Sequence, residues 1–166
     1  MTTATRSAEA PKACAACGEG VFQPIDVKGR MFAFRDERAL ALTESIVLPV
    51  CTVCGEIRES ESDAAALDAL LEQTYKARHA AITNDLMRRL LDVGWRQIEI
   101  EQAMGLSTGY LSKVIRGEKS LAVSTLRHLI HLALHPRRTL QDLAQYFPQA
   151  RELEQALDRR GALAAA

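Results

Sequence analysis

The sequence predicts an α+β fold, in which a small zinc-stapled β domain precedes an all-α helix-turn-helix domain. Two Cys-x-x-Cys pairs enclose strand-like runs near the N-terminus, and later apolar residues recur at helical spacing. We divide the chain into a four-cysteine zinc-binding domain with a flexible N-terminal tail (1–60), a linking helix (61–82), the helix-turn-helix domain (83–136) and an additional helical C-terminal extension (137–166).

The chain has 166 residues and no net charge, but its charges are unevenly distributed. Residues 1–74 carry 7 Lys and Arg against 12 Asp and Glu, whereas residues 75–138 carry 11 against 5. A basic centre suits contact with a polyanion, although chance clustering is the alternative. No apolar run is long enough to cross a bilayer and no secretion signal is evident, so we expect a cytoplasmic protein without membrane contact.

All four cysteines fall in two Cys-x-x-Cys pairs, Cys14/Cys17 and Cys51/Cys54, and each pair is followed by glycine. Four thiolates fill the tetrahedral shell of zinc, so we predict one structural zinc ion per chain with no open catalytic position. Two disulfides are the alternative, but the cytosol disfavours them. A redox motif would normally occur once, near a βαβ pattern.

Three strand-like runs lie between the cysteine pairs, at 21–22, 31–34 and 46–48. Polar breaks at 28–30 and 36–38 separate them. We expect a small antiparallel sheet held by the metal, because a domain of this size has a marginal apolar core.

A helical pattern follows from Ser62 to about residue 81, with Leu67, Leu70, Leu71 and Tyr75 on one face. Ser62 and the following aspartate provide a helix start. The helix is a spacer, a dimer contact or part of either domain, and the sequence leaves these alternatives open.

Four short helices are predicted between residues 83 and 136. We expect Thr83 to cap the first helix, which ends at Gly94 with Leu86, Leu90 and Leu91 facing inward. The second helix covers 95–104, with Ile98 and Ile100 among its apolar positions and Trp95 in the core. After a Gly105-Leu106-Ser107 turn, in which Ser107 is the expected cap, the third covers 108–116, and the fourth covers about 124–134.

The second and third helices, with the turn between them, are typical of a helix-turn-helix, whose second member enters the DNA major groove. An ordinary helical bundle with solvated charges is the alternative. We expect Arg88, Arg89, Arg96, Arg116 and Lys119 to contact phosphates. The candidate DNA-binding residues are Gln97, Ser107, Thr108, Gly109, Tyr110, Ser112, Lys113 and Arg116.

Taken together, residues 14–136 resemble the MqsA family of antitoxins. The likeness rests on the double Cys-x-x-Cys domain, the helix after it and the helix-turn-helix, in that order. Further similar stretches are Gly29-Arg30 between the strands, Glu61-Ser62-Asp63-Ala64, Ser124-Thr125-Leu126 and His135-Pro136.

This resemblance implies a structural zinc at the four cysteines, a homodimer formed through the C-terminal domain, and binding to a palindromic operator in the protein's own promoter. It also implies that the N-terminal domain binds a small ribonuclease toxin with a RelE-like fold. We therefore expect the repressor and antitoxin of a type II toxin–antitoxin pair. The alternatives are a stand-alone zinc-stabilised regulator without a toxin, and a zinc-stapled adaptor that does not bind DNA.

The chain departs from the family pattern at several positions. Gly109 and Lys113 stand where the family has a base-contacting Asn and Arg, so we expect a different operator. Glu101 stands where a small residue is common. In the longer tail, Thr139 and Pro148 each resemble a helix start.

The sequence contains no nucleophile–base pair, phosphate loop or open metal site, so we do not expect an enzyme. Three histidines, His128, His131 and His135, have helical spacing. Without a nearby cysteine or carboxylate they are a weak metal signal, and an exposed helix face or a dimer interface is the simpler interpretation.

Overall fold

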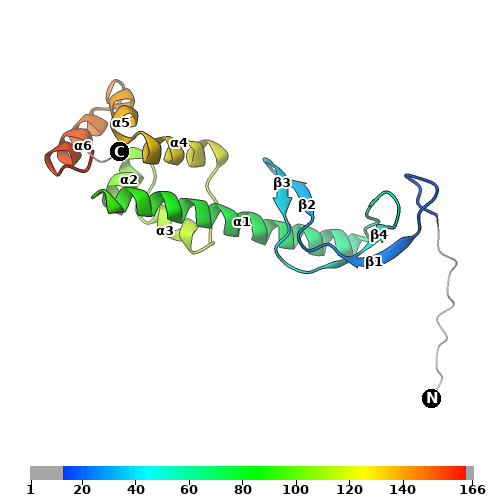
Figure 1. The fold of residues 1–166 in the computed structure, drawn as a ribbon. Coiled ribbons are helices and arrows are strands. Elements are labelled where there is room, and N and C mark those ends of the chain that lie inside the picture. The colour runs from blue at the N-terminus through cyan, green and yellow to red at the C-terminus, as the bar shows by residue number, and fades with distance from the viewer. Residues whose placement is uncertain (1–12, 164–166) are drawn as a thin grey trace, which may run out of the picture. The chain divides into compact units, whose positions relative to one another are not determined.

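The computed structural model describes residues 13–163, which form two compact units (Figure 1). We call residues 13–74 the cysteine unit and residues 75–163 the helical unit. A small β region at the N-terminus is followed by helices, so the α+β class is confirmed. Within the described residues, no helix combines the length and apolar character needed to cross a membrane.

The cysteine unit contains four strands in two two-stranded antiparallel sheets. In the first sheet β1 pairs with β4, placing Phe22 opposite Cys51, and in the second β2 pairs with β3, placing Met31 opposite Ala41. The strands are β1 (Phe22–Asp26), β2 (Met31–Phe34), β3 (Glu37–Ala41) and β4 (Val47–Cys51).

The predicted single sheet is therefore wrong, and the break predicted at 36–38 lies at 35–36 instead, because Glu37 and Arg38 belong to β3. Arg35 adopts a left-handed φ of 53°, which reverses the chain within two residues. Glu37 then pairs directly with Phe34 and begins β3. A left-handed arginine is uncommon, and nothing in the sequence pattern indicates it.

Helix α1 (Glu61–Asp92) is continuous, so the two separate helices predicted over this stretch are one. It begins after Ser60, whose Oγ accepts the Asp63 backbone N–H at 3.2 Å while the Asp63 carboxylate accepts the Ser60 N–H at 3.1 Å. Thr83 lies fully buried inside the helix and is not a cap. No Gly or Pro separates the two patterns, so the helix has no reason to stop there.

In the cysteine unit, α1 contributes two buried leucines. Leu67 and Leu71 are buried as predicted, and Thr43 Oγ1 lies 3.2 Å from Thr74 Oγ1. Besides the cysteines, the other buried apolar residues of this unit are Val27, Leu40, Leu42, Leu48 and Val50.

The helical unit continues with five shorter helices after the end of α1. Gly94, with φ 96°, follows α1 as predicted, and prolines occupy the first turn of α5 and of α6. The helices are α2 (Gln97–Ala103), α3 (Tyr110–Ile115), α4 (Val123–Leu134), α5 (Pro136–Ala144) and α6 (Pro148–Arg159).

Two predicted helix starts are wrong. Helix α3 begins at Tyr110 after Gly109, whose left-handed φ of 78° excludes an earlier start, so Ser107 is not its cap. Helix α5 begins at Pro136, and Thr139 lies inside it with its Oγ1 donating to the His135 carbonyl at 2.9 Å. The predicted start at Pro148 is confirmed.

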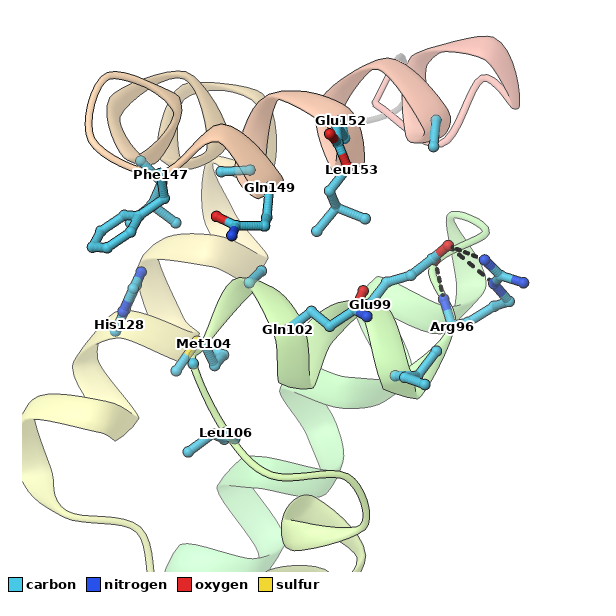
Figure 2. Close-up of a pocket in the computed structure, with 16 residues that line it drawn as sticks. Arg96, Glu99, Gln102, Met104, Leu106, His128, Phe147, Gln149, Glu152 and Leu153 are labelled. Atoms are coloured by element: carbon cyan, nitrogen blue, oxygen red, sulfur yellow. Dashed lines mark hydrogen bonds and ion pairs between the residues drawn. The ribbon is translucent and has the colours of Figure 1, made fainter.

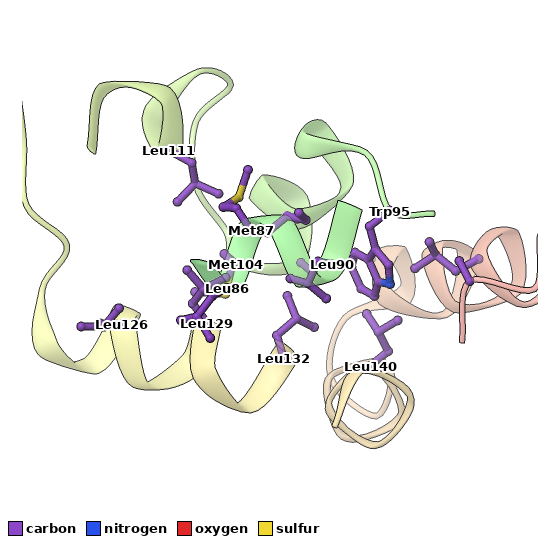
Figure 3. Packing of buried hydrophobic residues seen from close by; sticks show 14 of the residues in the cluster. Leu86, Met87, Leu90, Trp95, Met104, Leu111, Leu126, Leu129, Leu132 and Leu140 are labelled. Carbon is purple, nitrogen blue, oxygen red and sulfur yellow. The ribbon is translucent and has the colours of Figure 1, made fainter. Parts of the chain in front are cut away.

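One hydrophobic cluster forms the core of the helical unit (Figure 3). Trp95 is 2% exposed, as predicted, whereas Leu91, predicted to face inward, is 44% exposed. Of the two apolar positions named in the second predicted helix, Ile100 is fully buried and Ile98 is 45% exposed. The C-terminal extension belongs to the same cluster, to which it contributes Leu140, Leu157, Ala162 and Leu163.

Candidate metal centre and nucleic-acid interface

The four cysteine sulfurs form one cluster and lie within 4.8 Å of one another. Cys14 Sγ lies 3.7 Å from Cys54 Sγ, and Cys17 Sγ lies 3.7 Å from Cys51 Sγ. A tetrahedral ion with metal–sulfur bonds of about 2.3 Å, as for zinc, places its sulfurs about 3.8 Å apart. The cluster therefore fits a structural metal site, and both cysteine pairs contribute to it.

Each cysteine pair lies on a tight turn that a glycine completes. The Gly18 N–H donates to the Cys14 carbonyl at 2.7 Å, and the Gly55 N–H donates to the Cys51 carbonyl at 3.1 Å. Both glycines have left-handed φ angles near 75°. The predicted reason for a glycine after each pair is thereby confirmed.

Backbone N–H groups also point at the sulfurs. The Gly20 N–H lies 3.4 Å from Cys17 Sγ, and the Val53 N–H lies 3.5 Å from Cys51 Sγ. The N–H groups of Cys54 and Val53 lower the pKa of Cys51 to about 6, which favours its thiolate.

Not every sulfur in the cluster ionises readily without a metal. The Glu56 N–H lowers the pKa of Cys54, but burial and the three neighbouring sulfurs outweigh it and raise that pKa to about 12. Four thiolates this close repel one another, so a full set requires a cation between them.

Gly20 is a feature of this site that the sequence analysis missed. A Cβ atom at Gly20 would lie 2.2 Å from Cys51 Sγ, so only glycine fits there. Its carbonyl accepts the Cys14 N–H at 2.8 Å, which closes the chain around the first cysteine pair. A second glycine two residues after Gly18 is the only sequence signal for this role.

In the helical unit, the buried carboxylate of Glu101 holds the start of α3. Its Oε2 accepts the Gly109 N–H at 2.9 Å, and its Oε1 accepts the Leu111 N–H at 3.0 Å. Glu101 is 1% exposed. A side chain from α2 therefore caps α3, a role that the expected Ser107 does not perform.

Helix α3 has a buried side and an exposed side. Leu111 and Val114 are fully buried, while Lys113 and Arg116 are exposed on the opposite side, one turn apart. Gly109 lies just before α3 in a left-handed conformation and has no side chain to present. The geometry therefore brings two of the candidate DNA-binding residues, Lys113 and Arg116, onto one face.

The remaining candidate DNA-binding residues lie in three different settings. Ser107 and Thr108 are exposed in the turn before α3. Gln97 Nε2 donates to Ser112 Oγ at 2.8 Å and to Glu101 Oε1 at 3.0 Å, so both side chains brace α2 against α3. Tyr110 is half-buried.

Most of the expected phosphate-contacting residues have partners within the chain. Arg89 pairs with Asp85, Arg96 with Glu99 and Arg116 with Glu118, at 2.9, 2.6 and 2.6 Å. The Lys119 ammonium lies 5.3 Å from the centre of the Tyr110 ring. Arg88 and Lys113 are exposed.

Glu99 links the start of α2 to the end of the chain. Its carboxylate accepts the Arg96 backbone N–H at 2.8 Å and the Arg160 guanidinium at 2.6 Å. Burial opposes ionisation of Glu99, but these donors outweigh it and lower its pKa. The C-terminal helices are thus fastened to α2 by a buried carboxylate as well as by apolar packing.

No protein-family model matches this sequence, and no curated protein is significantly similar to it. The likeness to the MqsA family stays a prediction that rests on the motifs and their order.

Proposed function

We propose that this chain is a sequence-specific DNA-binding repressor that acts as the antitoxin of a type II toxin–antitoxin pair. The observation that supports it best is α3, which is braced from α2 by a buried carboxylate and presents Lys113 and Arg116 on its exposed side. A braced, exposed helix preceded by a short turn suits insertion into a major groove.

The braced start of α3 also limits how it would contact DNA. The Gly109 and Leu111 N–H groups already donate to Glu101, so they are not free to donate to a DNA phosphate. Binding would then depend on side chains, with Lys113 the leading candidate for a guanine or phosphate contact. Gln97 and Ser112 would act by bracing α2 against α3.

In this proposal the cysteine cluster binds one structural zinc ion per chain, held by Cys14, Cys17, Cys51 and Cys54. The sulfur separations, the thiolate-only donors and the two glycine-completed turns support zinc. The metal would supply stability to a unit whose apolar core is small, with no part in a reaction.

The toxin partner is inferred from the MqsA resemblance and from charge. Residues 1–74 are acidic in balance, whereas a ribonuclease that binds RNA tends to be basic. A homodimer on a palindromic operator follows from the same resemblance, because two-fold symmetric proteins read two-fold symmetric sites.

Native mass spectrometry of the protein, expressed with its neighbouring genes, tests the antitoxin role. A second small chain in stoichiometric complex, together with two zinc ions per homodimer, is the expected result. A zinc-loaded homodimer without a companion would favour the stand-alone regulator.

DNA binding is tested separately by gel shifts on the DNA upstream of the gene. A Lys113→Ala protein is expected to bind more weakly, and Lys28→Ala, which removes an exposed lysine from the cysteine unit, is the matched control. Absence of any shift by the wild-type protein would leave the zinc-stapled adaptor as the remaining alternative.

A further inference from the structure

A groove of about 870 Å³ opens inside the helical unit, between α2 and the hairpin formed by α5 and α6 (Figure 2). Met104 and Leu106 lie on one side of it, Leu153 extends into it from α6, and Phe147 and His128 lie at one end. Its volume is within the range of about 300–1,000 Å³ found for small-molecule sites.

The groove combines an apolar lining with a few polar groups. Ala103, Met104, Leu143 and Leu153 contribute apolar surface. The Gln102 and Gln149 side chains also line it, and within residues 13–163 neither amide makes a hydrogen bond to another side chain or to the backbone. Few polar groups on an apolar wall are typical of a site that orients an organic ligand.

The charges around the groove are largely neutralised within the protein. Arg96 pairs with Glu99 at 2.6 Å, and Arg160 reaches the same carboxylate. Burial, with His131 nearby, lowers the pKa of His128, which favours the neutral imidazole. Glu152 also lines the groove, and its carboxylate disfavours an anionic ligand.

We propose that this groove is a binding site for an uncharged, mostly apolar organic molecule of up to drug size, which hydrogen-bonds to Gln102 and Gln149. The apolar lining would contact most of the molecule, the Arg96 and Glu99 charges neutralise each other, and the Glu152 carboxylate is exposed, so that water screens its charge. The two amides offer both donors and acceptors to a carbonyl or hydroxyl group.

The site lies next to the element that holds α3. Met104 and Leu106 belong to the segment that joins α2 to α3, and Gln102 lies one residue after Glu101. A bound molecule would press on this segment and change DNA affinity. This regulatory consequence rests on the proposed function, whereas ligand binding itself does not.

Nile red, an uncharged fluorescent dye, tests the site in the full-length zinc-loaded protein. We expect saturable binding of one dye per chain, and binding at least about tenfold weaker after Ala156→Phe or Gln102→Phe, because each ring fills the groove from a different wall. Glu154→Phe adds the same ring on α6 outside the groove and is expected to bind as wild type does. The anionic dye anilinonaphthalene sulfonate is expected to bind more weakly than Nile red.

Unsaturable dye binding, or equal binding by the wild type and both groove-filling variants, would overturn this inference. So would an equal loss in the Glu154→Phe control, or anionic dye binding as tightly as Nile red. Gel shifts with and without Nile red separate the two proposals. If the dye binds specifically in the groove but the protein does not bind DNA, the ligand site is supported and the proposed function is contradicted. If the protein binds DNA but the dye does not bind specifically in the groove, the proposed function is supported and the ligand site is contradicted.

Discussion

The carboxylate of Glu101 accepts the backbone N–H of Leu111 at 3.0 Å, across the turn of the candidate helix-turn-helix. Both residues are almost completely buried. A helix ordinarily takes its cap from a residue adjacent in sequence, whereas α3 takes this one from ten positions earlier, on α2. The relative placement of the two helices is therefore fixed by a hydrogen-bonded carboxylate as well as by apolar packing.

Loss of this carboxylate should destabilise the helical unit. Glu101→Ala leaves the Gly109 and Leu111 N–H groups without their acceptor, and we expect a loss of about 3 kcal/mol in the free energy of unfolding. Urea denaturation followed by circular dichroism measures it. The control Glu118→Ala removes an exposed ion pair, and its free energy of unfolding should differ from that of the wild type by no more than about 0.5 kcal/mol. Equal effects of the two substitutions would contradict the bracing role.

Acid should weaken the attachment of the C-terminal helices through Glu99. Its pKa lies below the ordinary value of 4.5, so the carboxylate stabilises the folded state above that pH and the stabilisation disappears as pH falls through the folded-state pKa. We expect Glu99→Gln to be less stable than wild type near pH 7, with a difference that shrinks below about pH 4.5. Thermal unfolding at several pH values measures it.

Arg160→Gln serves as the comparison for Glu99→Gln. It removes one guanidinium from the same carboxylate and leaves Arg96 in place, so an intermediate pH dependence is expected. A stability difference for Glu99→Gln that stays constant between about pH 7 and about pH 3 would show that this carboxylate is not ion-paired in the folded protein.

A methyl group at Gly20 should damage the metal centre. The Cβ of Gly20→Ala would lie 2.2 Å from Cys51 Sγ, so we expect zinc affinity to fall by about tenfold or more. Competition with a chromophoric chelator measures it. Gly29→Ala is the control, because Gly29 has a left-handed φ but no atom within 4 Å of its added Cβ. Unchanged affinity in Gly20→Ala would rule out close packing of this glycine against the ligand.

Salt dependence should reveal how Lys113 acts on DNA. Lys113→Ala is expected to weaken operator binding by roughly 1–3 kcal/mol if the lysine reads a base. A phosphate contact instead predicts that binding weakens uniformly across DNA sequences. It also predicts that the slope of the logarithm of the binding constant against the logarithm of the salt concentration is smaller by about one. Fluorescence anisotropy at several salt concentrations measures both quantities. If the affinity and the salt dependence of Lys113→Ala equal those of the wild type, Lys113 does not contact the DNA.

The sequence predicted the elements that depend on local pattern. The cysteine spacing and the glycines after each pair predicted the cluster, and apolar spacing predicted most of the buried helix faces. The joined helix α1 and the start of α3 were missed for different reasons. Thr83 is a good cap residue, but with no helix stop before it the preceding helix simply continues. Ser107 was predicted to cap α3, but the left-handed conformation of Gly109 makes the helix begin only at Tyr110.

The features that depend on distant contacts left little trace in the sequence. Glu101 resembles any surface carboxylate of an amphipathic helix until α3 packs against it. The close approach of Gly20 to Cys51 exists only once both turns fold around one site. The groove needs the hairpin of α5 and α6, whose attachment through Glu99 and Arg160 spans 61 positions.

The burial of Trp95 gives the protein a built-in optical reporter. Trp95 is the only tryptophan in the chain, and it lies in the core of the helical unit, in the cluster that also contains Leu140 (Figure 3). Its indole is shielded from water and its Nε1 has no hydrogen-bond partner among the described residues, so its emission should shift to longer wavelength when this unit unfolds. The cysteine unit contains no tryptophan, so the fluorescence of Trp95 reports on the unfolding of the helical unit alone.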